Sequence, residues 1–233
     1  MRLEDKNIRG IKKGLKKEVK IEEIVKILES DERLGYAPVV SYVANLTKDP
    51  FKILISCILS LRTKDKTTSE ACRRLFKEAD NAEDMLKLGE DRISELIYPV
   101  GFYKTKAKRI VEISGILISE YGNRVPDELE ELMKLPGVGR KTANLVITEA
   151  YNKDGICVDT HVHRIMNRLG YVKSKKPEET EFELRRKLPL RYWKIINTLL
   201  VKLGQTICLP VKPLCNRCKI INYCNQIFVN RKG

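Results

Sequence analysis

The 233-residue sequence contains no long apolar run. The apolar stretches near its start are short and interrupted by Lys and Glu, so we expect neither a membrane-spanning helix nor the apolar core of a secretory signal. Alternating apolar and polar residues, which are typical of β-strands, are hard to find, and no internal repeat or low-complexity segment occurs. A Walker phosphate loop is also missing. These absences predict an intracellular protein that is not secreted and has no membrane partner.

Acidic residues are missing from the last fifty positions of the chain. Residues 1–30 carry nine basic and six acidic groups, residues 31–183 carry 25 of each, and residues 184–233 carry eleven basic groups and no acid. The net charge of +14 is therefore concentrated toward the C-terminal end. A one-sided basic surface favours a polyanionic partner, with nucleic acid first and anionic lipid second.

The seven cysteines are an odd number, and without a secretory signal a disulfide framework is not expected. Four of them form a C-x6-C-x2-C-x5-C pattern that predicts a metal site: Cys208, Cys215, Cys218 and Cys224. The choice is between zinc and an iron–sulfur cluster. Structural zinc sites usually have two cysteine pairs separated by a longer segment, whereas a single C-x2-C between lone cysteines is more typical of a loop around a cluster. The prolines between the first two ligands stiffen a loop that would display Lys212.

Apolar residues recur at spacings of three and four along most of the chain, which predicts helices. Gly and Pro residues punctuate the pattern between the helical segments. The segments predicted to be helical are 21–28, 51–61, 104–121, 126–135, 140–151, 160–169 and 191–203. We therefore expect an all-α protein of about ten short helices arranged in two lobes.

A glycine-containing turn, Leu135–Ala143, lies between two of these helices. Gly137 and Gly139 permit a tight turn with positive φ and leave backbone N–H groups uncovered, and the N-terminus of the next helix attracts phosphate. Lys141 falls in the first turn of that helix, where the positive end of the helix dipole disfavours the ammonium and favours the nucleophilic amine. Lys141 could instead only contact phosphate, as Arg140 could.

Asp159 stands immediately before the helix predicted over residues 160–169. It could serve only as an ordinary helix N-cap, or its carboxylate could stabilise a cationic sugar centre or move a proton. The sequence leaves both roles open. His161 and His163 are two positions apart and do not share a helix face, so a metal pair is not expected.

Together and in this order, the turn 135–143, the segment 158–164 and the four-cysteine pattern resemble the endonuclease III family of DNA glycosylases. The resemblance runs from about Phe51 to Cys224. It implies a six-helix barrel lobe (43–153) that contains a helix-hairpin-helix motif (126–151). It also implies a discontinuous second lobe (1–42 plus 154–233), whose loop 208–224 holds a [4Fe-4S] cluster on the four cysteines.

The resemblance also implies an activity and a partner. A family member is a DNA N-glycosylase with AP lyase activity that removes oxidised pyrimidines from damaged double-stranded DNA, so Lys141 would attack C1′ and Asp159 would assist. Gly137, Gly139, Arg140 and Lys212 would grip the DNA. We expect a monomer without an obligate protein partner, cytoplasmic and associated with the nucleoid if the source is prokaryotic.

Two loops would fill the hole left by the extruded nucleotide. Arg62 stands where Gln is frequent in the family, and Phe102 stands where Leu is frequent. Arg62 would read the orphaned base or contact phosphate.

Two other functions are possible for the chain. One is a monofunctional mismatch or adenine glycosylase of the same superfamily, against which Lys141 argues, and the other is a non-catalytic iron–sulfur DNA-binding module.

Overall fold

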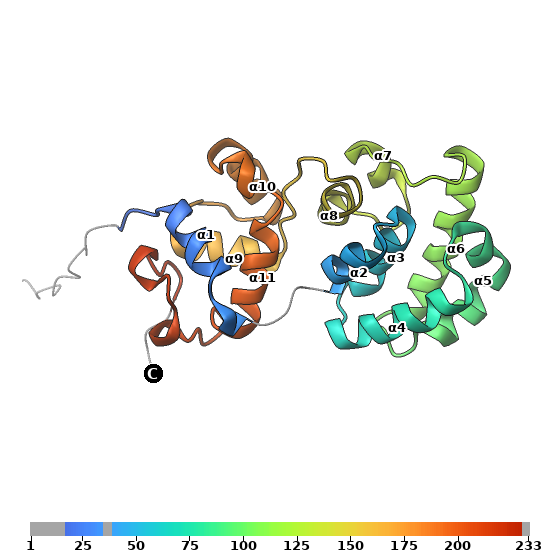
Figure 1. The fold of residues 1–233 in the computed structure, drawn as a ribbon, viewed down its shortest axis with the longest axis horizontal. Helices are drawn as coiled ribbons and strands as arrows, with labels where there is room; N and C mark the ends of the chain where they lie inside the picture. Colours follow the sequence, from blue (N-terminus) through green and yellow to red (C-terminus); the bar gives the residue numbers. More distant parts are fainter. Residues whose placement is uncertain (1–16, 35–38, 230–233) are drawn as a thin grey trace, which may run out of the picture.

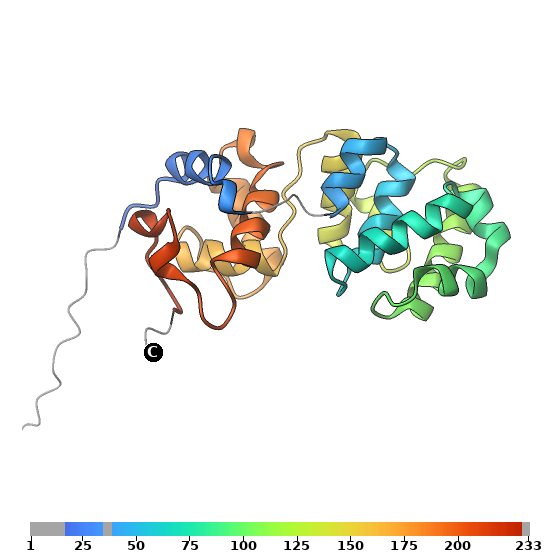
Figure 2. The same ribbon diagram turned by 60° about the horizontal axis from the view of Figure 1, so that its bottom comes forward.

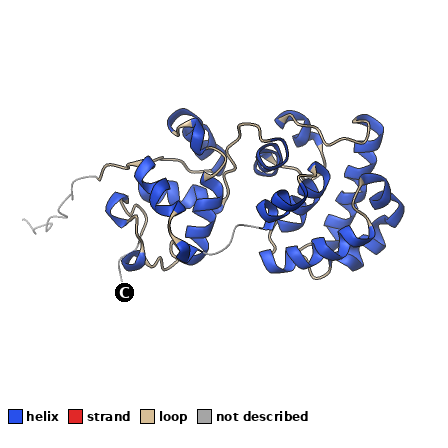
Figure 3. Cartoon of the chain, in the orientation of Figure 1, coloured by secondary structure: helices blue, strands red, loops and turns tan. Residues whose placement is uncertain are grey.

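The computed structural model describes residues 17–34 and 39–229, and every regular element within them is a helix (Figure 3). The helices form two lobes that lie side by side in both ribbon views (Figures 1 and 2). We call residues 39–153 the hairpin lobe, and residues 17–34 together with 154–229 the cysteine lobe. The all-α fold expected from the sequence is confirmed. The parts of the expected second lobe at 1–16, 35–38 and 230–233 lie outside the described residues.

The hairpin lobe is built around a buried central helix, α3 (Pro50–Ser60). Asp49 caps its N-terminus by accepting hydrogen bonds from the backbone N–H groups of Phe51 and Lys52, and Pro50 occupies the first turn, where its missing N–H costs nothing. Residues 51, 53–55 and 57–59 are buried apolar side chains, so this helix packs on several sides at once. It contacts α2 (Val39–Thr47), α4 (Asp65–Glu78) and α8 (Arg140–Tyr151).

The far side of the hairpin lobe is formed by α5 (Ala82–Ile97) and α6 (Tyr103–Glu120), which pack against each other. The first of these two helices is interrupted at Gly89, whose φ of 73° is not helical. A short helix, α7 (Leu129–Lys134), then leads through the glycine turn into α8. The turn and its two helices therefore sit on the side of the lobe that faces the cysteine lobe (Figure 1).

The cysteine lobe brings the two ends of the described chain together. Its helices are α1 (Ile21–Glu29), α9 (Thr160–Leu169), α10 (Pro177–Lys187) and α11 (Ile196–Thr206), with single 3-10 turns at Glu32–Leu34, Leu190–Tyr192, Cys215–Arg217 and Ile221–Tyr223. The apolar face of α1 buries Ile21, Ile24, Val25 and Leu28 in a core shared with α9 and α11. This core is separate from that of the hairpin lobe.

Helix bounds set by local signals match the sequence prediction best. The helices α8 and α9 cover the predicted ranges 140–151 and 160–169, and each is followed by a left-handed residue, Asn152 or Gly170. The prediction over 191–203 was wrong at its start, because a 3-10 turn follows Pro189 and α11 begins only at Ile196. Residues 126–128 are not helical, so α7 begins three residues later than expected.

None of the helices in the described ranges combines the length and the apolar composition needed to cross a bilayer.

Candidate active site

A cavity of about 540 Å³ opens between the two lobes. Its lining comes from the ends of several helices: the loop Ser60–Thr63 after α3, the start of α8 with Lys141, and the start of α9 with Asp159. Residues of α10 and α11 complete the wall on the cysteine-lobe side. The structure therefore brings three of the predicted functional segments, which are far apart in the sequence, to one cavity.

Lys141 lies in the first turn of α8, whose N-cap is Gly139. The side chain is half-buried in the cavity wall, and among the described residues its ammonium makes no hydrogen bond and no ion pair. An ammonium has three N–H donors and no acceptor, so an unpaired one inside a cavity is available for a ligand. The positive end of α8 points at the same space.

Asp159 is the N-cap of α9, which was the structural alternative raised from the sequence. Its Oδ1 accepts hydrogen bonds from the backbone N–H groups of His161 and Val162, both at 2.9 Å. The other carboxylate oxygen makes no hydrogen bond within the described part of the chain, and the residue lines the cavity. The capping role thus fixes the carboxylate at the cavity and leaves one oxygen unused. His163, on the same helix, forms a hydrogen bond with Thr180, with 2.7 Å between Nδ1 and Oγ1.

The glycine turn contains one left-handed residue, not two. Gly137 has a φ of 78°, and a Cβ there would lie 2.8 Å from Cδ of Arg109. The expectation of positive φ at both glycines was wrong at Gly139, which is extended (φ −92°) because it serves as the N-cap of α8. A Cβ at Gly139 would meet no atom within 4 Å. Its lack of a side chain therefore leaves open space in front of the helix N-terminus.

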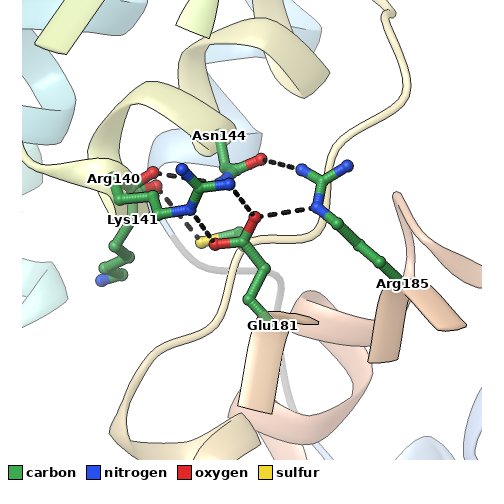
Figure 4. Close-up of polar contacts among 6 residues, drawn as sticks. Arg140, Lys141, Asn144, Glu181 and Arg185 are labelled. Carbon is green, nitrogen blue, oxygen red and sulfur yellow. Dashed lines mark hydrogen bonds and ion pairs between the residues drawn. The ribbon is translucent and has the colours of Figure 1, made fainter. Parts of the chain in front are cut away.

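The side chain of Arg140 reaches across to Glu181 of the cysteine lobe (Figure 4). Its guanidinium donates to both carboxylate oxygens of Glu181 on α10, Nε at 2.8 Å and one terminal nitrogen at 3.1 Å. Arg185 donates to the same carboxylate at 2.9 Å and to Oδ1 of Asn144 on α8 at 3.0 Å. The carboxylate is buried, with its side chain 3% exposed. These four side chains, which we call the inter-lobe ion-pair network, connect α8 to α10.

The two loops expected to enter DNA touch each other. Arg62 and Phe102 both adopt left-handed backbone conformations, with φ of 53° and 59°. The guanidinium carbon of Arg62 lies 5.7 Å from the centre of the Phe102 ring, within the range of a cation–π contact. Phe102 is 62% exposed, so it is not the core residue that a lone phenylalanine usually is. A large apolar side chain is thus held in solvent beside an exposed arginine.

The four C-terminal cysteines converge on one small apolar cavity. All four line it, together with apolar residues such as Ile165, Leu203 and Ile220. The terminal nitrogen of Arg168 donates to Sγ of Cys208 at 3.3 Å, and burial raises the pKa of Cys218 to about 11 and that of Cys224 above its usual range. No group of three or more His, Cys, Asp or Glu side chains among the described residues is arranged to hold a single metal ion.

Comparison with known proteins places this geometry in a family. Residues 55–190 match the model of the HhH-GPD superfamily base excision DNA repair protein. The chain belongs to this superfamily. Endonuclease III of Thermotoga maritima is 50% identical over 185 residues, which are 79% of this chain and 86% of that protein. Endonuclease III homolog 2, chloroplastic, of Arabidopsis thaliana is 46% identical over 187 residues, and the match covers 76% of this chain and 48% of that longer protein.

Two solved structures have the same fold. They are a non-covalent endonuclease III–DNA complex and a trapped endonuclease III–DNA covalent intermediate. Each aligns with a TM-score of 0.76 at 30% identity and covers 88% of this chain and 92% of the solved chain. The predicted membership of the endonuclease III family is confirmed, and the chain is a base-excision-repair DNA glycosylase.

In this endonuclease III relative, many of the positive charges of the C-terminal segment from residue 184 onward are paired with acidic residues in the folded molecule. Five of the nine described basic residues from 184 onward form ion pairs with acids from elsewhere: Arg185, Lys187, Arg191, Lys194 and Lys219. Lys212 makes no ion pair among the described residues and is exposed on its loop. The linear charge asymmetry therefore overstates the free positive surface, and Lys212 remains one of its members.

Glu181 and Lys106 are among the buried charged residues of this glycosylase that sequence reasoning missed. Glu181 has a partner 41 positions away on α8, so no local pattern reveals it. Lys106 lies on the apolar stripe of α6 and is 4% exposed. A lysine at a core position of a helical pattern was the available signal, because an unpaired buried ammonium is costly.

Proposed function

We propose that this chain is a bifunctional DNA glycosylase and AP lyase that removes oxidised pyrimidines from duplex DNA, with Lys141 as the nucleophile. The observation that carries the proposal is the unpaired ammonium of Lys141 in a cavity that also contains the carboxylate of Asp159. The amine form of a lysine can form a Schiff base with an electrophilic sugar carbon.

The chemistry follows from these two groups. Nζ of Lys141, after loss of a proton, forms a bond to C1′ of the damaged nucleotide, and the glycosidic electron pair leaves with the base. The free oxygen of Asp159 faces the same space and stabilises the positive charge that develops at C1′. Opening of the sugar gives an imine; loss of a proton from C2′ then expels the phosphate at C3′ and nicks the strand. Hydrolysis of the imine returns the free lysine.

The remaining predicted residues serve DNA binding in this proposal. Gly139 leaves open space at the N-terminus of α8, where backbone N–H groups can hold a phosphate. Arg62 and Phe102 project beside the cavity and would fill the space left by the extruded nucleotide. Lys212 would contact the phosphate backbone. The matching solved structures are complexes of endonuclease III with DNA, which supports DNA as the partner of this chain.

We further propose that Cys208, Cys215, Cys218 and Cys224 hold a [4Fe-4S] cluster. The donor set fits, because four thiols from a short segment line one apolar cavity, and an Arg168 N–H group and a backbone N–H group point at two of the sulfurs. A single zinc ion would need every sulfur within about 2.3 Å of one point. When bound, the cluster would fix the loop that carries Lys212.

A borohydride trapping assay tests the nucleophile. The protein is incubated with a duplex that carries thymine glycol or an abasic site, and the imine is reduced to a stable covalent adduct. We expect an adduct for the native chain and for the control Lys26→Ala, an exposed lysine on α1, and none for Lys141→Ala. Equal trapping by Lys141→Ala would overturn the assignment.

The same reactions separate the alternatives. Base release from a mismatched duplex without trapping indicates a monofunctional glycosylase, and binding without any product indicates a non-catalytic module. For the metal site, we expect a brown protein with bound iron and broad visible absorbance. Colourless protein with stoichiometric zinc refutes the cluster.

A further inference from the structure

Lys106 is a buried charge that the proposed reaction does not use. It lies on α6, one turn after Phe102, whose carbonyl accepts the backbone N–H of Lys106 at 3.0 Å. Its side chain points toward the end of α3 instead of toward solvent. An ammonium is rarely buried unless each of its three N–H groups finds an acceptor.

The ammonium of Lys106 has three acceptors on one short segment. Nζ donates to the carbonyl oxygens of Leu59 at 2.9 Å and Leu61 at 2.6 Å, and to Oγ1 of Thr63 at 3.2 Å. The last carbonyls of a helix have no N–H partner within the helix and carry the negative end of its dipole. Lys106 therefore caps the C-terminus of α3 and holds the backbone on both sides of Ser60, up to Leu61 immediately before Arg62.

The loop that carries Phe102 is bound to the same segment. The backbone N–H of Gly101 donates to Oγ1 of Thr63 at 3.2 Å. A Cβ at Gly101 would lie 2.7 Å from the carbonyl oxygen of Arg62, so the two backbones are in direct contact. Oγ1 of Thr63 thus accepts hydrogen bonds from both Lys106 and Gly101. Each of the two loops carries a left-handed residue, Arg62 in one and Phe102 in the other.

We infer that Lys106 is a positioning residue that cross-links these two loops, so that Arg62 and Phe102 enter the duplex as one preassembled wedge. The inference rests on the proposed function, because it assigns a device to the extrusion step of that reaction. Without the three hydrogen bonds, the end of α3 and the loop after it would have to be ordered during binding. The entropy of that ordering would reduce the rate on a duplex.

Two DNA substrates distinguish positioning from general damage to the fold. A single-stranded oligonucleotide with an abasic site needs no wedge, whereas a duplex with thymine glycol does. Lys106→Met keeps the length of the side chain and removes its donors; Lys108→Met removes the same charge from an exposed position on the same helix. We expect Lys106→Met to lower the single-turnover rate on the duplex by about tenfold, to leave borohydride trapping on the single strand within about twofold, and to be partly rescued in Lys106→Arg.

A second readout follows the wedge directly. With 2-aminopurine opposite the lesion, its fluorescence rises when the stack opens, and we expect a smaller rise with Lys106→Met than with the native chain or Lys108→Met. Equal losses on both substrates, or a duplex rate equal to the native one, overturn the inference. If the native chain traps no DNA of either kind, the proposed function fails first and the inference falls with it. Melting temperatures of all three variants show which of them remain folded.

Discussion

Replacing Glu181 by glutamine tests whether the inter-lobe ion-pair network holds the two lobes together. The native carboxylate accepts three N–H groups, two from Arg140 and one from Arg185. Glutamine keeps one oxygen and turns the other acceptor into an NH₂ group that faces a guanidinium N–H. At least one of the three hydrogen bonds is therefore lost, and both positive charges lose their counter-ion.

The size of the effect follows from the burial of the three side chains. Removing one partner of a fully buried ion pair costs about 3–5 kcal/mol, since the other charge is left uncompensated. Here Glu181 is buried, but the side chains of Arg140 and Arg185 are 26% and 27% exposed and water can reach them. We therefore expect a loss of about 2 kcal/mol in the free energy of unfolding. For a chain of this size, that corresponds to a fall of roughly 4–8 °C in Tm.

The assay is thermal and urea unfolding of Glu181→Gln, Arg140→Met and the double variant. If the contact connects the lobes, the two single losses overlap, and the double variant is less destabilised than their sum by about 1–2 kcal/mol. Glu183→Gln is the matched control on the same helix, because its partner Lys187 lies one turn away in the same lobe. That pair lies at the surface, with Lys187 exposed and Glu183 partly exposed, and contributes at most about 0.5 kcal/mol. Additivity of the first two variants within about 0.5 kcal/mol refutes the inter-lobe role and returns Arg140 to the predicted contact with phosphate.

Three further outcomes are expected from single substitutions. Lys212→Ala should weaken duplex binding and reduce by about one the magnitude of the slope of the logarithm of the binding constant against the logarithm of the salt concentration. The single-turnover rate at saturation should remain nearly unchanged. An unchanged slope excludes Lys212 from the binding face. Gly137→Ala should cost about 1–3 kcal/mol in urea unfolding, because of its positive φ and the contact with Arg109, while Gly139→Ala stays within about 1 kcal/mol of the native chain. Burial, with a smaller effect of Arg109, lowers the pKa of Lys106 to about 8 from 10.5. Between those pH values the unfolded chain binds more protons, so the stability of the native chain relative to Lys106→Met should rise with pH, by at most about 1.4 kcal/mol per unit; a flat difference contradicts the lowered pKa.

Features that depend on neighbouring residues could be predicted from the sequence. The start of α8 was read from the glycines before it, and the start of α9 from Asp159, because an N-cap or a turn glycine acts within one helical turn. The four cysteines lie within seventeen positions, so their convergence needed only a short loop. Family membership was recognised from the same local motifs. The 3-10 turn before α11 was missed because apolar spacing does not distinguish it from the first turn of an α-helix.

Features that depend on long-range pairing could not be read in this way. The acid-free tail was expected to contribute a one-sided basic surface. Lys219 pairs with the buried Asp31, however, and Arg191 and Lys194 pair with acids from α1 and from the inter-lobe connection. The net charge of a segment predicts the charge of the surface it forms only if its basic residues are not paired with acidic residues from other segments. The positive groups that can meet DNA are therefore those left after folding has paired the rest.

The candidate site is built from helix ends. Its own residues could be predicted from the sequence, whereas the residues that hold those helix ends in place could not. Lys141 lies in the first turn of α8, Asp159 precedes α9, Phe102 precedes α6 and Arg62 follows α3, so each residue proposed to react or to bind DNA is placed by the terminus of a helix. Distant side chains hold two of these termini: Lys106 binds the end of α3, and Glu181 binds Arg140 at the start of α8. The variants of Lys106 and Glu181 should therefore change how the reactive residues meet DNA while leaving those residues themselves intact. If variants at both positions lose activity on a duplex, we expect Lys141 to be trapped on a single-stranded substrate all the same. That combination would show that the variants change the placement of the reactive residues and not their chemistry.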